Sequence, residues 1–316
     1  MPENRVKILV TGGAGNVGGA LAEALAGDPS FFVVVVDNLR TGSLDKLPRN
    51  QHDNFRFIKA DVNNLADLSS VMLSWHFDYV FHYAALVGVK KTLANPIDVL
   101  NDIDGIRNIL NLSKNTGVKR VFFSSSSEVY GEPVEFPQNE HTTPLNSRLP
   151  YAIVKNVAEA FFRSYQKEYG LDFTIFRFFN TYGPKQSNDF VVSRFIDLAL
   201  RNEPITLYGD GRQTRTFCYI DDNIEATIRI FKGGLYINDV VNLGSHIETP
   251  IADLARKVIE ITGSKSTIVN LPPLEEGDMT RRLPDNSKML SVLGRELLPL
   301  EDGIRNVLRI RFGKDF

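Results

Sequence analysis

Tyr151 and Lys155 stand four residues apart, a spacing that puts both side chains on one face of a helix. A free tyrosine has a pKa of about 10, so its phenolate is scarce at neutral pH. A neighbouring ammonium stabilises the phenolate and turns tyrosine into a usable base. The pair could therefore remove a proton from a sugar or alcohol hydroxyl, although this spacing also arises by chance.

A polar run, Ser124-Ser125-Ser126-Ser127-Glu128, follows an apolar segment and is expected to end a strand. The carboxyl ends of strands face the ligand crevice in doubly wound sheets. Ser126 could therefore hydrogen-bond a reacting hydroxyl, and Glu128 could act as a general acid or base. A polar surface loop with a solvated glutamate is the alternative interpretation.

A glycine-rich loop, T-G-G-A-G-N-V-G at Thr11–Gly18, lies between an apolar run and a helical pattern. Its glycines permit a tight turn, close approach of backbone N–H groups to a pyrophosphate, and close packing of helix on strand. The helix N-terminus favours the negative phosphates. The loop therefore predicts a dinucleotide site, to which we assign Gly12, Gly15, Asn16, Val17 and Gly18.

Asp37 ends the second predicted strand, at the place where a carboxylate receives the adenosine ribose hydroxyls. Its charge would repel a 2′-phosphate, which favours NAD over NADP, although Arg40 lies nearby. Asp61 and Val62 follow the third predicted strand and could address the adenine, or could simply end that strand.

Short apolar runs rich in Val, Ile and Phe alternate with helical patterns through the first half of the chain. Runs with little polar alternation are typical of strands buried on both faces. The order predicts an α/β fold, a doubly wound parallel Rossmann sheet. The predicted strands are Val6–Val10, Phe31–Val36, Phe55–Ile58, Tyr79–His82, Val118–Phe123 and Phe173–Phe178, and the helices are Gly18–Ala26, Leu65–Trp75, Pro96–Thr116 and Tyr151–Tyr169.

The regular alternation of apolar runs and helical patterns ends near Asn180, and this change predicts a smaller C-terminal substrate lobe. We assign residues 1–180 to the Rossmann domain, with a return segment near residues 215–243, and residues 181–316 mainly to the lobe. Glu132–Pro150 carries four prolines and predicts a long functional loop. Further helical patterns cover Phe190–Asn202, Ile220–Phe231, Pro250–Thr262 and Leu283–Arg309.

Composition narrows the class of protein. The chain has 316 residues, 43% of them hydrophobic, and a net charge of -2, so nothing indicates nucleic acid or an anionic membrane as a partner. Cys218 is the single cysteine, which suits a reducing compartment. No signal peptide and no membrane-spanning run is evident, so we expect a cytoplasmic location. No metal site is expected.

The joint order of these motifs resembles the extended short-chain dehydrogenases/reductases, in particular the nucleotide-sugar epimerase/dehydratase/decarboxylase group. The resemblance runs essentially end to end. Asn16 departs from it, because an aromatic is usual in the glycine loop. Its landmarks are T-G-G-A-G-N-V-G, Asp37-Asn38, Asp61-Val62, His82-Tyr83-Ala84-Ala85, Asn101-Asp102-Ile103-Asp104-Gly105, S-S-S-S-E-V-Y-G, Y-A-I-V-K, R-F-F-N-T-Y-G-P, Y-G-D-G-R-Q-T-R-T-F-C-Y-I-D-D, Val241-Asn242-Leu243-Gly244 and Arg281-Arg282 before Asp285 and Lys288.

The resemblance implies roles for single residues. Ser126, Tyr151 and Lys155 would be the catalytic triad, with Glu128 beside them. NAD would be held by the glycine loop together with Asp37, Asn38, Asp61, Val62, Ala84, Ala85, Asn101, Ser124 and Phe178. A UDP-sugar or other nucleotide-sugar would be held by Ser127, Asn180, Arg215 and Arg282. Arginine forks match phosphate oxygens, although a surface salt bridge is the alternative for each arginine.

The resemblance also implies a reaction, oxidation at the sugar C4 to a 4-keto intermediate. Ser127-Glu128 resembles UDP-glucuronate decarboxylases and some 4,6-dehydratases, which favours a lyase step afterwards. Y-A-I-V-K resembles the epimerases more, so a UDP-sugar 4-epimerase is the alternative. A non-catalytic NAD-binding regulator is the remote alternative. Family dimers suggest a homodimer through helices Pro96–Thr116 and Tyr151–Tyr169, the latter carrying Phe161, Phe162 and Tyr165.

Overall fold

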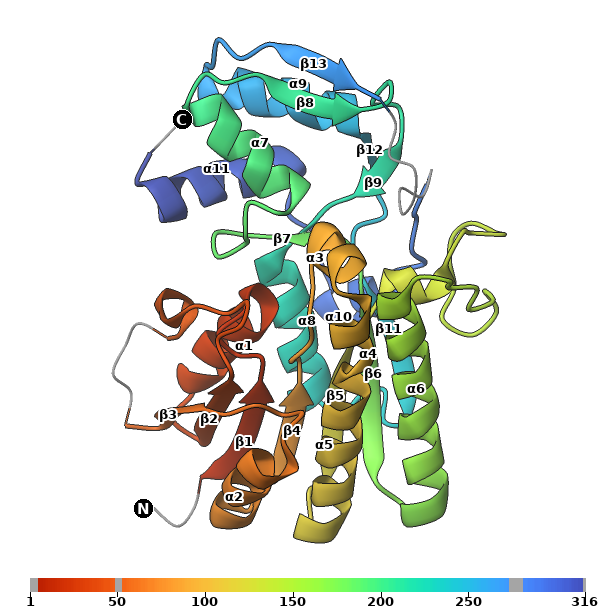
Figure 1. The fold of residues 1–316 in the computed structure, drawn as a ribbon. Helices are drawn as coiled ribbons and strands as arrows, with labels where there is room; N and C mark the ends of the chain where they lie inside the picture. The colour runs from red at the N-terminus through yellow and green to blue at the C-terminus, as the bar shows by residue number, and fades with distance from the viewer. Residues whose placement is uncertain (1–4, 49–52, 273–280, 315–316) are drawn as a thin grey trace. The chain divides into compact units, whose positions relative to one another are not determined.

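The computed structural model describes residues 5–48, 53–272 and 281–314. The chain divides into two compact units, each built from three separate segments (Figure 1). The first unit comprises residues 1–129, 147–177 and 227–241. The second comprises residues 130–146, 178–226 and 242–316.

The first unit is built around a seven-stranded sheet in the order β11-β6-β5-β4-β1-β2-β3. The pairs from β5 to β3 are all parallel, and the order reverses between β1 and β4. This confirms the predicted doubly wound α/β fold and places the end of β1 where such sheets bind ligands. The strands are β1 Val6–Thr11, β2 Phe31–Asp37, β3 Phe55–Lys59, β4 Tyr79–His82, β5 Arg120–Ser126, β6 Asp172–Phe178 and β11 Asp239–Leu243.

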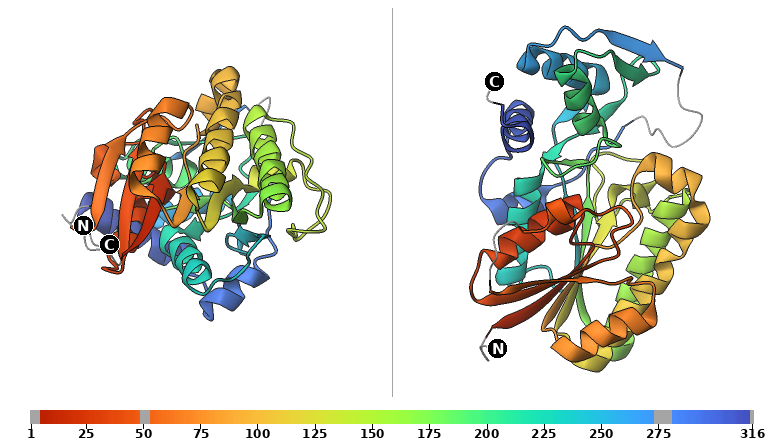
Figure 2. Two further views of the ribbon diagram at one scale, coloured as in Figure 1. Left: turned by 90° about the horizontal axis from the view of Figure 1, so that it is seen from below. Right: turned by 60° about the vertical axis from the view of Figure 1, so that its left-hand side comes forward.

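Helices cover both faces of this sheet (Figure 2). One face carries α1 Asn16–Ala26 and the C-terminal part of α8 Ile220–Lys232. The other carries α2 Leu65–Trp75, α5 Asp102–Thr116 and α6 Pro150–Tyr169. Shorter elements are η1 Leu44–Lys46, α3 Val89–Ala94, α4 Pro96–Leu100 and η2 Ser127–Tyr130.

Aromatic and β-branched residues fill the space between the sheet and its helices. The rings of Phe81 and Phe122 on neighbouring strands stack 4.4 Å apart. Phe231 of α8 meets both of them edge-on at 5.6 Å, and Phe162 of α6 stacks on Phe123 at 4.9 Å. Full burial of such a side chain stabilises a fold by roughly 1.5–3 kcal/mol, so these contacts fix α6 and α8 on opposite faces.

The second unit contains three two-stranded sheets, β10-β7, β12-β9 and β13-β8, with helices beside them. Within the parts of the chain that the model describes, no helix has the length and apolar character needed to cross a membrane. The elements are β7 Thr181–Tyr182, α7 Val191–Leu200, β8 Ile205–Tyr208, β9 Thr214–Thr216, β10 Cys218–Tyr219, β12 Glu248–Pro250, α9 Ile251–Thr262, β13 Ile268–Leu271, α10 Ser287–Leu293 and α11 Leu300–Phe312.

Two predicted helices are interrupted. Pro96–Thr116 is two helices, because the amide of Asp104 bonds the carbonyl of Asn101 at 3.0 Å in a tighter i→i−3 pattern. Leu283–Arg309 is also two helices. The first ends where Gly294 adopts a left-handed φ of 63°, and the second begins after Pro299.

Candidate functional site

The structure brings the predicted Tyr–Lys pair to the carboxyl end of β5. Proline at the first position of α6 suits a helix start, and Tyr151 and Lys155 follow one turn apart. Lys155 is only 3% exposed, and its Nζ donates to the carbonyl of Ser124 at 2.7 Å. The same nitrogen lies 5.8 Å from the centre of the Tyr151 ring. An ammonium at this distance stabilises a phenolate by Coulomb attraction.

Burial lowers the pKa of Lys155 to about 8, because a low-dielectric setting disfavours the ammonium. The carboxylates of Asp102 and then Glu159 oppose this effect. Lys155 is therefore charged below this pH and loses its charge above it.

Ser126 and Glu128 closely follow Ser124, whose carbonyl binds Lys155, and they are joined to each other. Ser126 is the last residue of β5, so the serines belong to the strand instead of following it. Glu128 begins the next turn, η2, and its amide donates to Ser126 Oγ at 3.2 Å. Ser126 and Glu128 are half-buried, whereas Ser127 between them is buried. The predicted catalytic residues of β5, η2 and α6 thus belong to one unit.

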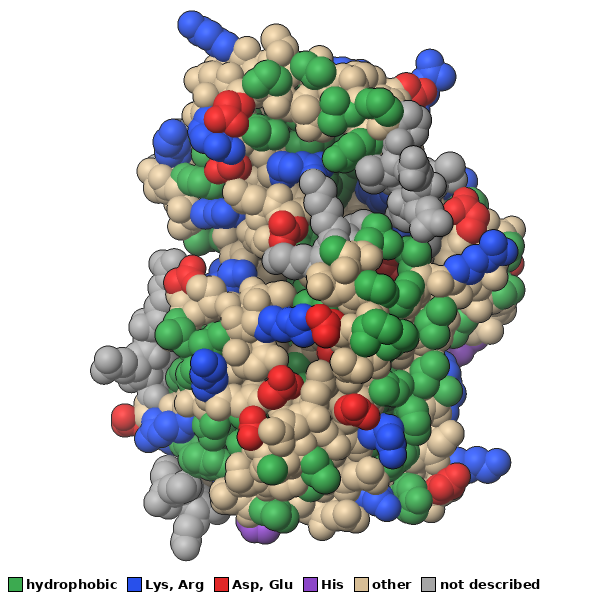
Figure 3. Space-filling view, viewed as in Figure 1, with side chains coloured by type: hydrophobic (Ala, Val, Ile, Leu, Met, Phe, Trp, Pro, Cys, Tyr) green, Lys and Arg blue, Asp and Glu red, His purple; other side chains and the backbone are tan. Residues whose placement is uncertain are grey.

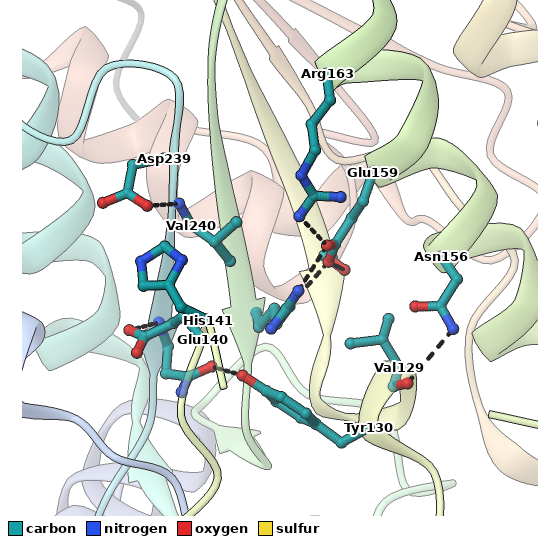
Figure 4. Close-up of polar contacts among 12 residues, drawn as sticks. Val129, Tyr130, Glu140, His141, Asn156, Glu159, Arg163, Asp239 and Val240 are labelled. Atoms are coloured by element: carbon teal, nitrogen blue, oxygen red, sulfur yellow. Dashed lines mark hydrogen bonds and ion pairs between the residues drawn. The ribbon is translucent and has the colours of Figure 1, made fainter. Parts of the chain in front are cut away.

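An ion cluster around the buried carboxylate of Glu159 was not predicted from the sequence (Figure 4). Glu159, one turn beyond Lys155, accepts from Nε and Nη2 of Arg177 at 2.9 and 2.7 Å. It also accepts from Ser125 Oγ at 2.7 Å and from Arg163 at 3.1 Å. The cluster ties α6 to β5 and β6 next to the predicted catalytic residues. The spacing of Glu159 from Lys155, a further four residues, was the available signal.

The glycine loop has the close approaches that a dinucleotide requires. Gly12 has a φ of +69°, and a Cβ there would lie 2.6 Å from the amide nitrogen of Ala84. A Cβ on Gly18 would collide with the carbonyl of Gly12. The first turn of α1 carries no acidic side chain, so its positive end suits phosphate. The residues present therefore fit the predicted cofactor.

Asp37 binds the glycine loop and places a negative charge beside it. Its carboxylate accepts from the amides of Ala14 at 3.0 Å and Leu39 at 2.8 Å. The nearby Arg40 is bound to Asp98 at 2.5 Å. Because that guanidinium is already paired with a carboxylate, it is a weak counter-charge for a 2′-phosphate.

The other predicted cofactor residues lie at or after the ends of neighbouring strands, except Asn101, which lies between two helices. The Asn38 amide donates to Asp61 at 3.0 Å, which joins the ends of β2 and β3. Val62 is buried, Ala84, Ala85 and Ser124 are half-buried, and Asn101 is exposed between α4 and α5.

Thr11 and His82 were not assigned a role by motif. Thr11 Oγ1 accepts from the amides of Tyr83 at 3.1 Å and Ala84 at 3.2 Å, so its proton points to His82 Nδ1 at 2.8 Å. The hydrogen-bond pattern therefore assigns the Nε2-protonated tautomer to His82. Burial, with the nearby charge of Lys155, lowers the pKa of His82 to about 3 and keeps the ring neutral.

The predicted substrate residues Asn180, Arg215 and Arg282 belong to the second unit, together with Phe178 at the end of β6. Asn180 has a left-handed φ of 28°, and its buried Nδ2 has no hydrogen-bond partner among the residues that the structure describes. Arg215 lies half-buried on β9, and Arg282 is 5% exposed. The surface-salt-bridge alternative therefore does not suit Arg282.

A tether brings the strand of Arg215 and the segment of Arg282 together. Both oxygens of Glu248 on β12 accept from Arg281, at 2.7 and 2.6 Å, and β12 pairs with β9 opposite Arg215. A two-pronged guanidinium contact fixes orientation as well as distance. This positioning pair was not singled out from the sequence.

The model of the NAD dependent epimerase/dehydratase family matches residues 8–244. This chain belongs to that family. The family contains enzymes, and dependence on NAD is characteristic of the family. UDP-glucuronic acid decarboxylase 1 of Danio rerio is 35% identical, over 97% of this chain and 73% of that protein.

Solved structures of related enzymes match the fold of this chain over almost its whole length. The UDP-glucose 4-epimerase of Thermotoga maritima, determined with UDP-glucose, has a TM-score of 0.91 and 32% identity, covering 98% of this chain and 99% of that one. The dTDP-glucose 4,6-dehydratase of Streptomyces venezuelae, determined with NAD and TYD bound, has a TM-score of 0.88 and 28% identity, covering 98% of both chains.

Proposed function

We propose that this protein oxidises a nucleotide-sugar at C4 and then carries out a lyase step, with UDP-glucuronate as the first substrate to test. The observation that carries the proposal is Glu128, joined to Ser126 at the end of β5. Exchange of the C4 proton needs a single base, and Tyr151 serves for that. The carboxyl group of Glu128, in the turn that follows Ser126, adds a second titrating group to the proposed site, which suits a reaction with a further step. The similarity to a UDP-glucuronic acid decarboxylase supports the same choice.

NAD, when bound, supplies the hydride acceptor and later the hydride donor. The glycine loop and the α1 N-terminus would hold its pyrophosphate, through Gly12, Gly15, Asn16, Val17 and Gly18. Asp37 would hold the adenosine ribose. The remaining proposed contacts are Asn38, Asp61, Val62, Ala84, Ala85, Asn101, Ser124 and Phe178.

Asp37→Asn should weaken NAD binding and relax the preference for NAD over NADP. The change keeps an acceptor oxygen but removes the charge, and a hydrogen bond to a charged group contributes about 1.5–3 kcal/mol, so the Kd for NAD should rise on the order of tenfold or more. Calorimetric titration with both dinucleotides measures this. Asp53→Asn, at an exposed carboxyl group, is the control. Tighter binding of NADP than NAD by the unmodified protein would contradict the assignment.

In the first step Tyr151, as phenolate, takes the proton of the C4 hydroxyl while Ser126 orients that hydroxyl. Lys155 stabilises the phenolate, and the hydride leaves C4 for the cofactor, so the sugar becomes a 4-ketone. Ser127, Asn180, Arg215 and Arg282 would bind the sugar and the diphosphate.

The ketone then determines what can follow. If C6 is a carboxylate, its bond to C5 breaks, carbon dioxide leaves, and the electron pair is delocalised into the ketone before C5 is protonated. If C6 carries a hydroxyl, Glu128 can assist its loss as water. In the 4-epimerase alternative, favoured by the likeness to the Thermotoga enzyme, the hydride returns to the other face of C4.

Incubation with UDP-glucuronate, UDP-glucose, UDP-N-acetylglucosamine and dTDP-glucose, followed by mass spectrometry and NMR, tests the function. Loss of carbon dioxide from UDP-glucuronate is the expected result. Epimerisation with no loss of mass from any of the sugars would contradict the lyase proposal and support the epimerase alternative.

Glu128→Gln should separate the possible second steps, since it removes the titrating group and keeps the shape. Dehydration should fall by about 10²–10⁴-fold, because elimination needs proton transfer, and decarboxylation should slow less. An epimerase should tolerate the change. Single-turnover product analysis, with absorbance of reduced cofactor as a second signal, measures it. Glu132→Gln, at an exposed carboxyl group, is the control.

A homodimer through α5 and α6 is also proposed. Hydrophobic side chains gather over these helices in Figure 3, and Val157, Phe161, Tyr165 and Tyr169 line a shallow pocket on α6. Phe162, by contrast, is 1% exposed in the core, so it cannot belong to such an interface. Light scattering should give the mass of two chains, and Val157→Glu should reduce it to one. A monomeric mass for the unmodified protein at micromolar concentration would contradict the proposal.

A further inference from the structure

The loop that follows β2 carries two opposite charges at the place where dinucleotide cofactors are distinguished. Asp37 ends the strand, and Arg40 stands three residues later. In dinucleotide-binding folds a carboxylate at this place receives the adenosine ribose hydroxyls of NAD, whereas a nearby arginine accommodates the 2′-phosphate of NADP. The charge of Asp37 favours NAD, so the surroundings of Arg40 decide whether the loop also attracts NADP.

Short-range hydrogen bonds fix the backbone that leads to Arg40. Leu39 has a left-handed φ of 62°, and its amide donates to Asp37 Oδ1 at 2.8 Å. The amide of Arg40 donates to Asn38 Oδ1 at 2.9 Å. Bonds of this kind between side chain and backbone define a tight turn. The point at which the Arg40 side chain leaves the loop is therefore well defined.

The guanidinium of Arg40 binds a carboxylate from another element. Its Nη2 donates to Oδ2 of Asp98 at 2.5 Å, across 58 residues of sequence. Asp98 lies in α4, and the Arg40 and Asp98 side chains are 52% and 40% exposed. A charge-assisted contact orients the guanidinium and balances its charge. The cation that could attract a 2′-phosphate is thus held by a group of opposite charge.

The position of Asp98 does not depend on Arg40. The next residue, Val99, is 0% exposed and belongs to the hydrophobic core of the first unit. The amide of Val99 donates to the carbonyl of Asn95 at 3.2 Å, and Pro96 suits the first position of the helix. An ion pair as exposed as this one adds little to stability, so removing the Asp98 charge should leave the fold intact.

We propose that Asp98 determines cofactor specificity by withholding Arg40 from the 2′-phosphate of NADP. This inference rests on the proposed role of Asp37 in holding the adenosine ribose. Asp37 repels an additional phosphate, and Asp98 occupies the cation that could bind it, so two carboxylates from different elements act in the same direction. Asp98 belongs to no chemical step and acts through Arg40.

The direction of the expected effect follows from this arrangement. Asp98→Asn keeps the size of the side chain and an acceptor oxygen, but it removes the charge that balances Arg40. A guanidinium forms charge-assisted bonds to phosphate oxygens, so the affinity for NADP should rise by about tenfold. The affinity for NAD should change little, because NAD has no phosphate at that position. The gain should shrink at high salt, which screens exposed charges.

The test is calorimetric titration of the full chain, freed of bound nucleotide, with NADP and with NAD. Asp98→Asn is compared with the unmodified protein, and Asp98→Ser serves if the first variant does not fold. A double variant that combines Asp98→Asn with Arg40→Gln shows whether the gain depends on the guanidinium. Asp104→Asn is the matched control, because Asp104 is also an exposed aspartate in the first turn of a helix and faces Arg107 at 4.0 Å.

The ratio of the two dissociation constants should shift toward NADP by about tenfold in Asp98→Asn. It should return to the unmodified value in the double variant and should not move in Asp104→Asn. An unchanged ratio in Asp98→Asn would overturn the inference, as would a gain that persists without Arg40 or that appears equally in the control. Because the titration needs no sugar, a shifted ratio in a protein that converts no UDP-sugar would count against the proposed function alone.

Discussion

Tyr151→Phe should abolish turnover while leaving the fold and NAD binding intact. Only the phenolic oxygen is lost, and proton transfer by a positioned side chain contributes about 10²–10⁴-fold to a rate. The ring remains to pack against the core beside α6. Initial rates on the accepted UDP-sugar, with NAD affinity and the unfolding midpoint measured in parallel, check this expectation.

Tyr169→Phe is the matched control, because it makes the same change at the far, exposed end of the same helix. Its rate should equal that of the unmodified enzyme. Near-normal turnover by Tyr151→Phe would contradict the mechanism in which the Tyr151 hydroxyl group transfers the C4 proton.

Arg177→Met should strongly destabilise the protein without touching a reacting group. Arg177 is 1% exposed and Glu159 is 0% exposed, so the change takes from a buried carboxylate the guanidinium that binds both of its oxygens. Breaking one side of such a pair costs about 3–5 kcal/mol. Unfolding in urea, monitored by circular dichroism, should report a loss of this size in the free energy of unfolding.

Arg163→Met is the comparison, because this arginine binds the same carboxylate from a surface position that leaves it 48% exposed. An exposed pair contributes only about 0–1 kcal/mol, so the loss should be small. Equal effects of the two variants would contradict the buried role of Arg177.

The acid dependence of this cluster also has a definite sign. Burial raises the pKa of Glu159, but Arg177, with smaller contributions from Ser125 and Arg163, outweighs this effect and holds the pKa below the ordinary 4.5. A carboxyl group with a depressed pKa stabilises the fold above its unfolded-state value, and that stability is lost as the pH falls through the folded value. The difference between the unmodified protein and Arg177→Met should therefore shrink in acid.

The sheet was predictable from the sequence because most of its strands are buried on both faces and form continuous apolar runs, the edge strand β3 being the more exposed exception. The Tyr–Lys pair and the glycine loop were predictable for a similar reason, since each depends on neighbours in the chain. The strand end was less exact. β5 continues to Ser126, because a polar serine can stay in a sheet ladder through its backbone.

The supporting residues could not be predicted because their partners are distant in sequence. Glu159 meets Arg177 across 18 residues and Ser125 across 34, and Thr11 meets His82 across 71. Periodicity reports which face of a helix is apolar, but not which buried carboxylate finds which guanidinium. Asp98 was not singled out from the sequence, and its bond to Arg40 depends on how α4 meets the loop after β2.

The position of β11 at the edge of the first unit's sheet bears on how this chain is made. The strand Asp239–Leu243 lies next to β6, although sixty residues separate the two in the sequence. During synthesis, one edge of β6 therefore stays without its partner strand while much of the second unit is translated. An unpaired edge is a site for misassociation. The nascent chain is thus most open to misassociation in that interval, before β11 completes the sheet.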